Sequence, residues 1–257
     1  MGKFDGILIM SDWDGTLCYG REIARSNTEK IRSFCSEGGI FTVCTGRFFS
    51  HIESFADRIM PNTYVACLNG AYIIEPRSKE ILYEGYAGNE IHGVLDEFAR
   101  NFPDFEGFSI YTRGCDSALQ TPPKEYLKIK NELEGKQLYK AMLLSRTEEN
   151  TLAARDFVNA KGFPLLKAVR SWNTGLELMS PKSTKGTAAR LIKERVGAKT
   201  LICVGDYEND ADMLTAADVS YAPENALDSI KKIATKTTAH VSCGAIGAVI
   251  DDIERNL

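Results

Sequence analysis

Two aspartates follow an apolar run near the beginning of the chain, where residues 7–17 read ILIMSDWDGTL. A continuous apolar run is typical of a strand that is buried on both faces of a parallel sheet. Alternate side chains of an extended segment leave from the same face, so we expect Asp12 and Asp14 to address one substrate atom while Trp13 points elsewhere. Two carboxylates at this spacing require a compensating cation and indicate phosphoryl chemistry. The alternative interpretation is that Asp14 and Gly15 only form a turn.

A second acidic segment follows another apolar run, because residues 201–210 read LICVGDYEND. In open α/β sheets, ligands bind at the carboxyl ends of the strands. We therefore expect Asp206 to be a third carboxylate for a cation shared with Asp12 and Asp14, and Mg²⁺ favours such carboxylates together with water and phosphate oxygens. The residues expected to orient this shell or the loop are Asn209 and Asp210. Asp210 is also a candidate N-cap of the helix that follows.

Two further segments are candidates for binding an anion. Thr45, Gly46 and Arg47 lie between a predicted strand and a predicted helix, where backbone N–H groups and the threonine hydroxyl can bind a phosphate group. Lys185 also precedes a predicted helix, and Lys182 is its nearby rival in the same polar loop. The alternative for either lysine is an ordinary solvated side chain.

The pattern along the chain predicts a doubly wound α/β domain with an insertion. Ser26 to Glu29 has the form of a capping box that opens a helix ending before Gly38. The elements expected next are strands at 40–44 and 64–68 and a helix that begins near 49. The pattern then changes, with hairpin arms expected at 71–75 and 80–84. The elements expected within the insertion are helices at 90–101 and 148–161 and strands at 108–112, 139–144 and 175–179. Those expected after it are helices at 186–195 and 210–216, strands at 200–204 and 219–222, and a closing helix after Gly244.

Composition narrows the class of protein. The chain has 257 residues, 44% hydrophobic and 26% charged content, and a net charge of −4, which argues against a nucleic-acid surface or an anionic membrane as partner. No apolar stretch approaches the roughly 20 residues that cross a bilayer, and the first residues carry no signal region, so we expect a cytoplasmic protein. Seven cysteines without a Cys-x-x-Cys pair indicate neither a disulfide framework nor a zinc site.

The segments described above occur in the order of the four motifs of the haloacid-dehalogenase-like (HAD) superfamily, and the chain resembles that superfamily over nearly its whole length. The matching segments are residues 12–17, 45–47, 185–186 and 205–210. Asn69-Gly70-Ala71 and the long insertion after the second motif most resemble the Cof-type sugar-phosphatase branch. Trp13 fills a slot that is more often aliphatic, which leaves the acids unchanged.

The resemblance implies an α/β fold with a Rossmann-like, doubly wound parallel sheet core and an inserted cap. The core would comprise residues 1–76 and 181–257, and a large α/β cap of the C2 type would comprise residues 77–180. The implied activity is a Mg²⁺-dependent phosphomonoesterase that acts on a small phosphorylated metabolite through an aspartyl-phosphate. The expected assembly is a monomer or a small homo-oligomer. The insertion has no motif that matches a known substrate.

The resemblance also implies a role for each residue of the site. Asp12 would be the nucleophile, and Asp14 would protonate the leaving alcohol and then activate the hydrolytic water. The implied Mg²⁺ ligands are the Asp12 side chain, the Asp14 backbone carbonyl and Asp206, with support from Asn209 or Asp210. The implied ligands of the phosphoryl oxygens are Thr45, Gly46 and Lys185.

Two other functions remain open. A phosphosugar mutase would use the same aspartate pair and return the phosphoryl group to a sugar instead of to water. A receiver-like module would be phosphorylated on Asp12 as a signal, although Asp14 and the insertion argue against it. A dehalogenase is disfavoured because a departing halide needs no proton, which would leave Asp14 and a metal without a task.

Overall fold

The apolar run at residues 7–11 forms the centre of a parallel sheet in the computed structural model, which describes residues 2–102 and 105–256. The five strands of this sheet are β1 (Ile7–Ser11), β4 (Ile40–Val43), β13 (Thr200–Val204), β14 (Val219–Pro223) and β15 (Lys236–Thr238). Their order is β15-β14-β13-β1-β4, and each pair is parallel. Every residue of β1 is buried, as expected for a strand covered on both faces.

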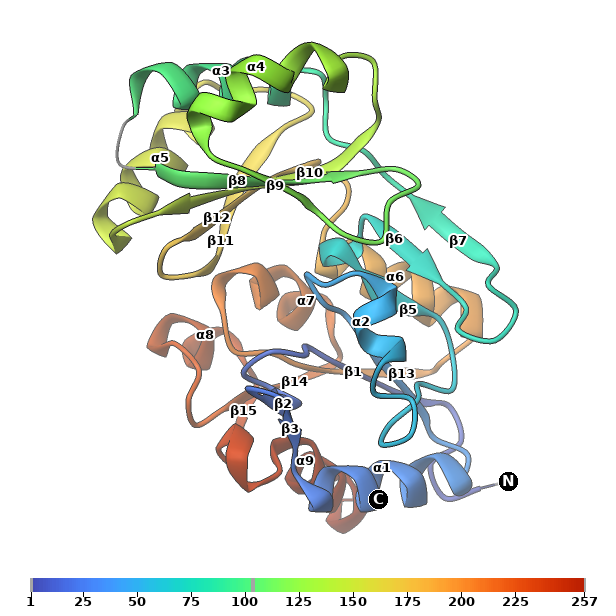
Figure 1. Cartoon of the computed structure of the whole chain (residues 1–257). Coiled ribbons are helices and arrows are strands. Elements are labelled where there is room, and N and C mark those ends of the chain that lie inside the picture. Colours follow the sequence, from blue (N-terminus) through green and yellow to red (C-terminus); the bar gives the residue numbers. More distant parts are fainter. Residues whose placement is uncertain (1, 103–104, 257) are drawn as a thin grey trace. The chain divides into compact units, whose positions relative to one another are not determined.

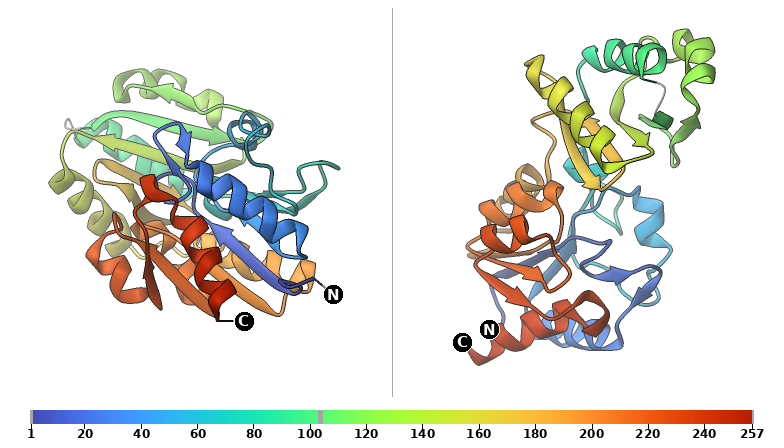
Figure 2. Two further views of the ribbon diagram at one scale, coloured as in Figure 1. Left: turned by 90° about the horizontal axis from the view of Figure 1, so that it is seen from below. Right: turned by 90° about the vertical axis from the view of Figure 1, so that its left-hand side faces the viewer.

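Helices cover both faces of this sheet (Figure 1). They are α1 (Arg25–Ser36), α2 (Phe49–Glu53), α6 (Lys185–Val196), α7 (Ala211–Ala216), α8 (Asp228–Ile233) and α9 (Ala245–Arg255). Side chains of α6, α7 and α8 share one apolar cluster with alternate residues of β1 and β13, including Leu8, Met10 and Leu201. α1 and α9 pack side by side, as Figure 2 shows from two further directions. The predicted α/β class with a doubly wound parallel sheet is confirmed.

The segment after β4 differs from the predicted third strand of the main sheet. β5 (Val65–Cys67) lies beside β4, but among the described residues its ladder pairing there is limited to an isolated parallel bridge between Ala66 and Cys44, the residue after β4. It forms a separate three-stranded sheet with β6 (Tyr72–Ile74) and β7 (Ile81–Glu84), in the order β5-β6-β7. The same compact unit also contains five short elements, β2 (Cys18–Tyr19), β3 (Glu22–Ile23), η1 (Leu68–Gly70), η2 (Glu208–Asp210) and η3 (Val241–Cys243).

The predicted capping box at the start of α1 is wrong. The helix begins at Arg25 with Ala24 as its N-cap, and no side chain caps it. Glu29 instead pairs with Arg25 at 2.6 Å between Oε1 and Nε. Asn27 accepts a hydrogen bond from the backbone N–H of Gly247 at 2.9 Å. The polar side chains of this turn therefore serve an ion pair and the packing of α9 instead of capping α1.

A second compact unit extends from Glu84 to Ser183, whereas the predicted insertion was 77–180. Its elements are α3 (Glu90–Asn101), β8 (Phe105–Thr112), β9 (Leu119–Thr121), α4 (Pro123–Leu133), β10 (Leu138–Ser145), α5 (Glu148–Ala160), β11 (Lys167–Trp172) and β12 (Gly175–Met179). The strands form an antiparallel sheet in the order β11-β12-β10-β8-β9. All three helices contribute to one apolar core with the sheet, so they cover the same face.

The other face of this sheet carries polar groups. Lys140 on β10 and Glu177 on β12 form a fully buried ion pair, with 2.7 Å between Nζ and Oε2. Ser171 donates a hydrogen bond to the other oxygen of Glu177 at 2.5 Å, and the Lys140 ammonium lies 4.5 Å from the centre of the Tyr111 ring. Buried charges are retained only when they are paired in this way.

Among the described residues, no helix has the length and apolar character that crossing a bilayer requires.

Candidate active site

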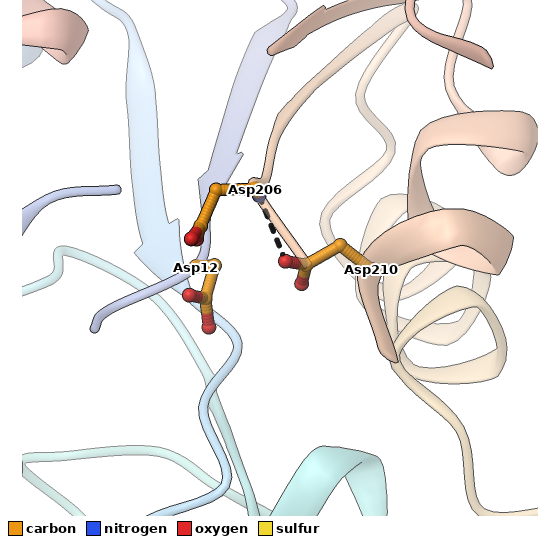
Figure 3. A group of neighbouring side chains, drawn as sticks. All are labelled: Asp12, Asp206 and Asp210. Carbon is orange, nitrogen blue, oxygen red and sulfur yellow. Dashed lines mark hydrogen bonds between the residues drawn. The ribbon is translucent and has the colours of Figure 1, made fainter. Parts of the chain in front are cut away.

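The carboxyl ends of β1 and β13 bring two of the predicted acids together. The strands are in register from Ile7 opposite Thr200 to Ser11 opposite Val204. The pairing continues one residue further, because the backbone N–H of Asp12 donates to the carbonyl of Val204 at 2.8 Å. Asp12 and Asp206 therefore leave neighbouring strands at one sheet edge, where Figure 3 shows their carboxylates beside that of Asp210.

Three carboxylates form the centre of the site. Asp12, Asp206 and Asp210 each offer an oxygen, and these oxygens lie within 4.8 Å of one another. Thr16 donates to Asp206 at 2.7 Å. Asp210 Oδ2 accepts hydrogen bonds from the backbone N–H groups of Asp206 at 2.9 Å and Tyr207 at 3.0 Å. Asp210 occupies the N-cap position of α7, as the alternative interpretation predicted, but its side chain makes no bond that caps this helix. Its carboxylate instead belongs to the capping box of η2 and orders the loop after β13.

Lys185 is the cation of this cluster. Its Nζ lies 2.5 Å from Asp12 Oδ1 and 2.6 Å from Asp210 Oδ1, and its side chain is 1% exposed. It is the first residue of α6, whose N-cap Thr184 accepts a hydrogen bond from the backbone of Thr187. A helix N-terminus disfavours a positive charge, so the acids, and not the helix, account for the position of Lys185. Lys182, its rival in the same loop, is exposed.

Burial and crowding shift the pKa values of these groups. Burial raises the pKa of Asp12 well above its ordinary value, in opposition to the attraction of Lys185. Burial and the nearby Asp210 raise the pKa of Asp206 to about 7, against the hydrogen bond from Thr16. Burial alone would lower the pKa of Lys185, but Asp12 and Asp210 raise it well above its ordinary value, so this side chain remains a cation.

The donor set suits a divalent cation. The buried acids Asp12 and Asp210 and the half-buried Asp206 face one lysine, which leaves an excess of negative charge in a site of low dielectric. Carboxylate oxygens are the ligands that Mg²⁺ prefers, and burial together with the nearby Asp210 raises the pKa of Asp206, a shift that a bound cation would oppose. Asp12 and Asp206 are placed to hold such an ion, with Asp210 adjacent.

Removal of Mg²⁺ is expected to expose this excess charge as a dependence of stability on pH. Because the pKa of Asp206 is raised from 3.8 to about 7 in the folded chain, the folded state binds more protons than the unfolded state between about pH 4 and pH 7. The free energy of unfolding of the metal-free protein should therefore fall as the pH rises through this window, by up to roughly 4 kcal/mol. Since bound Mg²⁺ requires ionised carboxylates, it should raise the melting temperature more at pH 8 than at pH 5.

Thermal unfolding in MgCl₂ and in EDTA at both pH values measures this difference. In Asp206→Asn the Mg²⁺-induced shift at pH 8 should largely disappear. A shift of equal size at pH 5 and pH 8 in the unmodified protein would contradict the argument.

Asp14 lies outside the three-carboxylate cluster. Its side chain is 48% exposed and forms a two-bond ion pair with Arg47, at 2.9 Å from Nε to Oδ2 and 2.9 Å from Nη2 to Oδ1. The expectation that Asp12 and Asp14 share one face of a strand is wrong. The strand ends at Ser11, and the chain then turns, with the carbonyl of Trp13 accepting backbone N–H groups from the residues four and five positions later.

The backbone confirms the turn interpretation of Asp14 and Gly15, whereas the functional interpretation of Asp14 stays a prediction. Gly15 has φ of +83°, and a Cβ at this position would lie 2.5 Å from Asp206 Oδ2. Asn225 donates to the carbonyl of Gly15 at 2.7 Å. Glycine is required because the turn passes directly against the Asp206 carboxylate.

The predicted phosphate loop lies beside this cluster. Thr45 is buried, its hydroxyl oxygen accepts the backbone N–H of Arg47 at 3.1 Å, and its own N–H donates to Ala66 at 2.9 Å. The Thr45 hydroxyl keeps a proton that it can donate to an anion. Gly46 follows in the same loop. α2, which begins after this loop, has five residues and is too short to provide the predicted helix N-terminus for an anion.

Asn209, which was expected to lie beside the cation, donates a hydrogen bond from its amide nitrogen to Asn69 Oδ1 at 3.3 Å. Other residues of the site were not assigned from the sequence. Arg47 was predicted only as part of an anion-binding segment, and it pairs with Asp14. Thr16, Asn69 and Asn225 were given no role, although Thr16 and Asn69 stand within segments that the family resemblance marked. Nothing in the local sequence marks Asn225, which reaches Gly15 from 210 positions away.

Comparison with known proteins gives consistent matches over nearly the whole chain. A family model for haloacid dehalogenase-like hydrolases matches residues 9–250. The putative phosphatase YxeH of Bacillus subtilis is 24% identical over 249 residues, which cover 90% of this chain and 92% of that protein. A solved haloacid dehalogenase-like hydrolase from B. subtilis has a TM-score of 0.80 at 20% identity and covers 95% of this chain and 98% of its own. A structure described as a HAD subclass IIB sugar phosphatase has a TM-score of 0.78 at 19% identity, with coverage of 96% and 98%.

Proposed function

Because the chain belongs to the haloacid dehalogenase-like hydrolase family, we propose that it is a Mg²⁺-dependent phosphomonoesterase that acts on a small phosphorylated metabolite. The observation that carries this proposal is the cluster of three carboxylates, two of which, Asp12 and Asp210, are buried and bridged by Lys185. A single nucleophilic carboxylate cannot approach a phosphate dianion without added positive charge. This cluster combines such a carboxylate with a fixed cation and a donor set for a second cation.

Asp12 is the proposed nucleophile. One of its carboxylate oxygens attacks phosphorus, the bond from phosphorus to the ester oxygen breaks, and an aspartyl-phosphate forms. Lys185, already at 2.5 Å from Asp12, offsets the charge that gathers on the phosphoryl oxygens. Asp12 and Asp206 would hold Mg²⁺, which when bound would supply further positive charge to the site. The Thr45 hydroxyl is the proposed additional donor to them.

Asp14 is the proposed general acid and base. In the first half-reaction it gives a proton to the departing alcohol, and in the second it takes a proton from the water that attacks phosphorus. The bond between phosphorus and Asp12 then breaks, which releases inorganic phosphate and restores the Asp12 carboxylate. The ion pair with Arg47 holds Asp14 on the exposed side of the turn, where both an alcohol and a water molecule have access.

Asp14→Asn is expected to separate the two half-reactions. The nitrophenolate of p-nitrophenyl phosphate leaves without a proton, so the first half-reaction should survive, while hydrolysis of the aspartyl-phosphate should slow by about 10²–10⁴-fold. Rapid mixing should then show a burst of about one nitrophenolate per active site. Alkyl phosphates, whose leaving group needs the proton, should show no burst. Loss of the exposed Arg47 pair should change the unfolding free energy by less than about 1 kcal/mol, and steady turnover at the unmodified rate would refute the role.

The test of the proposed function is release of inorganic phosphate from a panel of sugar phosphates, nucleotides and pyridoxal phosphate, with Mg²⁺ and with chelator. Rapid, Mg²⁺-dependent release supports it. Transfer of the phosphoryl group within a sugar without release would indicate the mutase, and a long-lived phosphorylated chain without turnover would indicate the receiver-like module.

We also propose that the unit from Glu84 to Ser183 is the cap that selects the substrate. One protein of similar fold is described as a sugar phosphatase, and its match covers 96% of this chain. Exclusion of water during the reaction would be its second task.

A cytoplasmic location stays a prediction.

A further inference from the structure

Asn69 has a buried side-chain amide whose nitrogen makes no hydrogen bond. The residue is 1% exposed, and Nδ2 is among the few buried side-chain polar atoms of the described chain without a partner. Buried amide groups nearly always have partners, because an unsatisfied donor loses its hydrogen bonds to water without replacement. Such an amide in a site points to a ligand that supplies the missing acceptor.

The rest of Asn69 is held by the loops of the site. Its Oδ1 accepts a hydrogen bond from Asn209 at 3.3 Å, and its backbone N–H donates to the carbonyl of Thr45 at 2.8 Å. Because the two atoms of the amide lie in one planar group, the bond to Oδ1 also fixes the direction of Nδ2. Asn209 adjoins Asp210, and Thr45 belongs to the proposed phosphate loop.

The backbone around Asn69 is forced into a left-handed conformation. Leu68, Asn69 and Gly70 have φ values of 52°, 56° and 92°, and a leucine at positive φ is a genuine outlier. A Cβ on Gly70 would lie 2.4 Å from the carbonyl oxygen of Thr184, the residue before Lys185. Asn69 and Gly70 therefore lie in contact with three loops, those that follow β4 and β13 and the one that precedes α6.

These contacts place the unused donor in the ring of loops that presents Thr45, Lys185 and Asp210. An amide N–H cannot bind a metal cation, and it needs an acceptor oxygen. On the basis of the proposed function, we propose that Asn69 Nδ2 donates a hydrogen bond to a phosphoryl oxygen of the bound substrate. Asn69 is then a further phosphate-binding residue, in addition to Thr45 and Lys185.

The experiment measures binding of orthovanadate, a mimic of the transferring phosphoryl group, by isothermal titration calorimetry with Mg²⁺. Asn69→Gly removes the donor and keeps the positive φ without strain. Asn69→Asp keeps the oxygen that accepts from Asn209 and tolerates the same backbone, but it replaces the donor with a second oxygen and adds a negative charge, so Asn69→Gly is the deciding variant. Both variants should bind orthovanadate at least about tenfold more weakly, the size expected for one hydrogen bond to a charged group.

Lys79→Gly is the matched control, because Lys79 also has a positive φ, of 61°, but lies in the exposed turn before β7. It should bind orthovanadate as the unmodified chain does. Equal affinity in the unmodified chain and in Asn69→Gly overturns the proposal, even if Asn69→Asp binds more weakly or turnover falls, because the loss would then come from charge or from loop position. Failure of the unmodified chain to release phosphate from any ester would instead overturn the proposed function.

Discussion

Replacement of Asp12 by Asn is expected to reduce phosphate release by at least about 10⁴-fold, the loss seen when a covalent nucleophile is removed. The amide has the shape of the carboxylate but cannot form the acyl phosphate. Folding should survive, because burial already disfavours the charged form of Asp12 and Asn removes one of three acids that repel one another. Steady-state phosphate release and thermal unfolding in EDTA measure the two effects separately.

Asp57→Asn is the control for Asp12→Asn. It makes the same chemical change at an exposed position on the segment after α2 and should leave turnover unchanged. Loss of turnover in Asp12→Asn together with a melting temperature at or above that of the unmodified protein would assign the loss to chemistry. Residual release at more than a few per cent of the unmodified rate would show that another group is the nucleophile.

Lys185→Met is expected to impair both stability and activity. Its ammonium lies within 2.6 Å of two buried carboxylates, so its removal leaves uncompensated charge in the interior. Breaking a buried pair in this way costs about 3–5 kcal/mol, and loss of one preorganised charge at a phosphoryl group costs about 10²–10³-fold in turnover. Chemical denaturation at pH 8 and phosphate release with saturating Mg²⁺ provide the two measurements.

The destabilisation of Lys185→Met should shrink at low pH. Asp12, with its pKa raised by burial, takes up a proton more readily once its partner is gone, and a protonated acid needs no cation. Lys182→Met, at an exposed position of the same loop, should change neither property. A stability loss of equal size at pH 5 and pH 8 would mean that packing of the lysine stem, and not charge, is what the site needs.

Long apolar segments were predicted well from the sequence. The strands expected at 175–179 and 200–204 and the helix expected at 90–101 coincide with β12, β13 and α3, because each buries a regular apolar pattern. β15 was missed because its three residues, Lys236–Thr238, are polar and largely exposed. β11 was missed because charged and apolar residues alternate irregularly along it. The predicted family, fold class and enzyme class, a phosphatase of the haloacid dehalogenase-like family, are confirmed.

The order of acids after apolar runs was sufficient to predict that Asp12 and Asp206 lie together. Parallel strands end at one edge of their sheet, so a residue that directly follows each of two adjacent strands has little freedom in its position. The same local pattern marked Lys185 as a candidate, although nothing in it distinguished this residue from Lys182. The roles of these residues in the reaction stay predictions.

Only the tertiary structure decided where the other groups point. Asp14 turns to Arg47 because the strand ends before it, and side-chain direction in a turn depends on backbone angles that residue spacing does not reveal. The family resemblance implied Lys185, and the structure supports it over Lys182 because its ammonium reaches two acids that arrive from distant segments. Asn69 enters the site through contacts with Thr45 and Asn209. Local sequence specifies which residue types follow each strand, whereas the pairing of distant loops is set by how the whole chain packs.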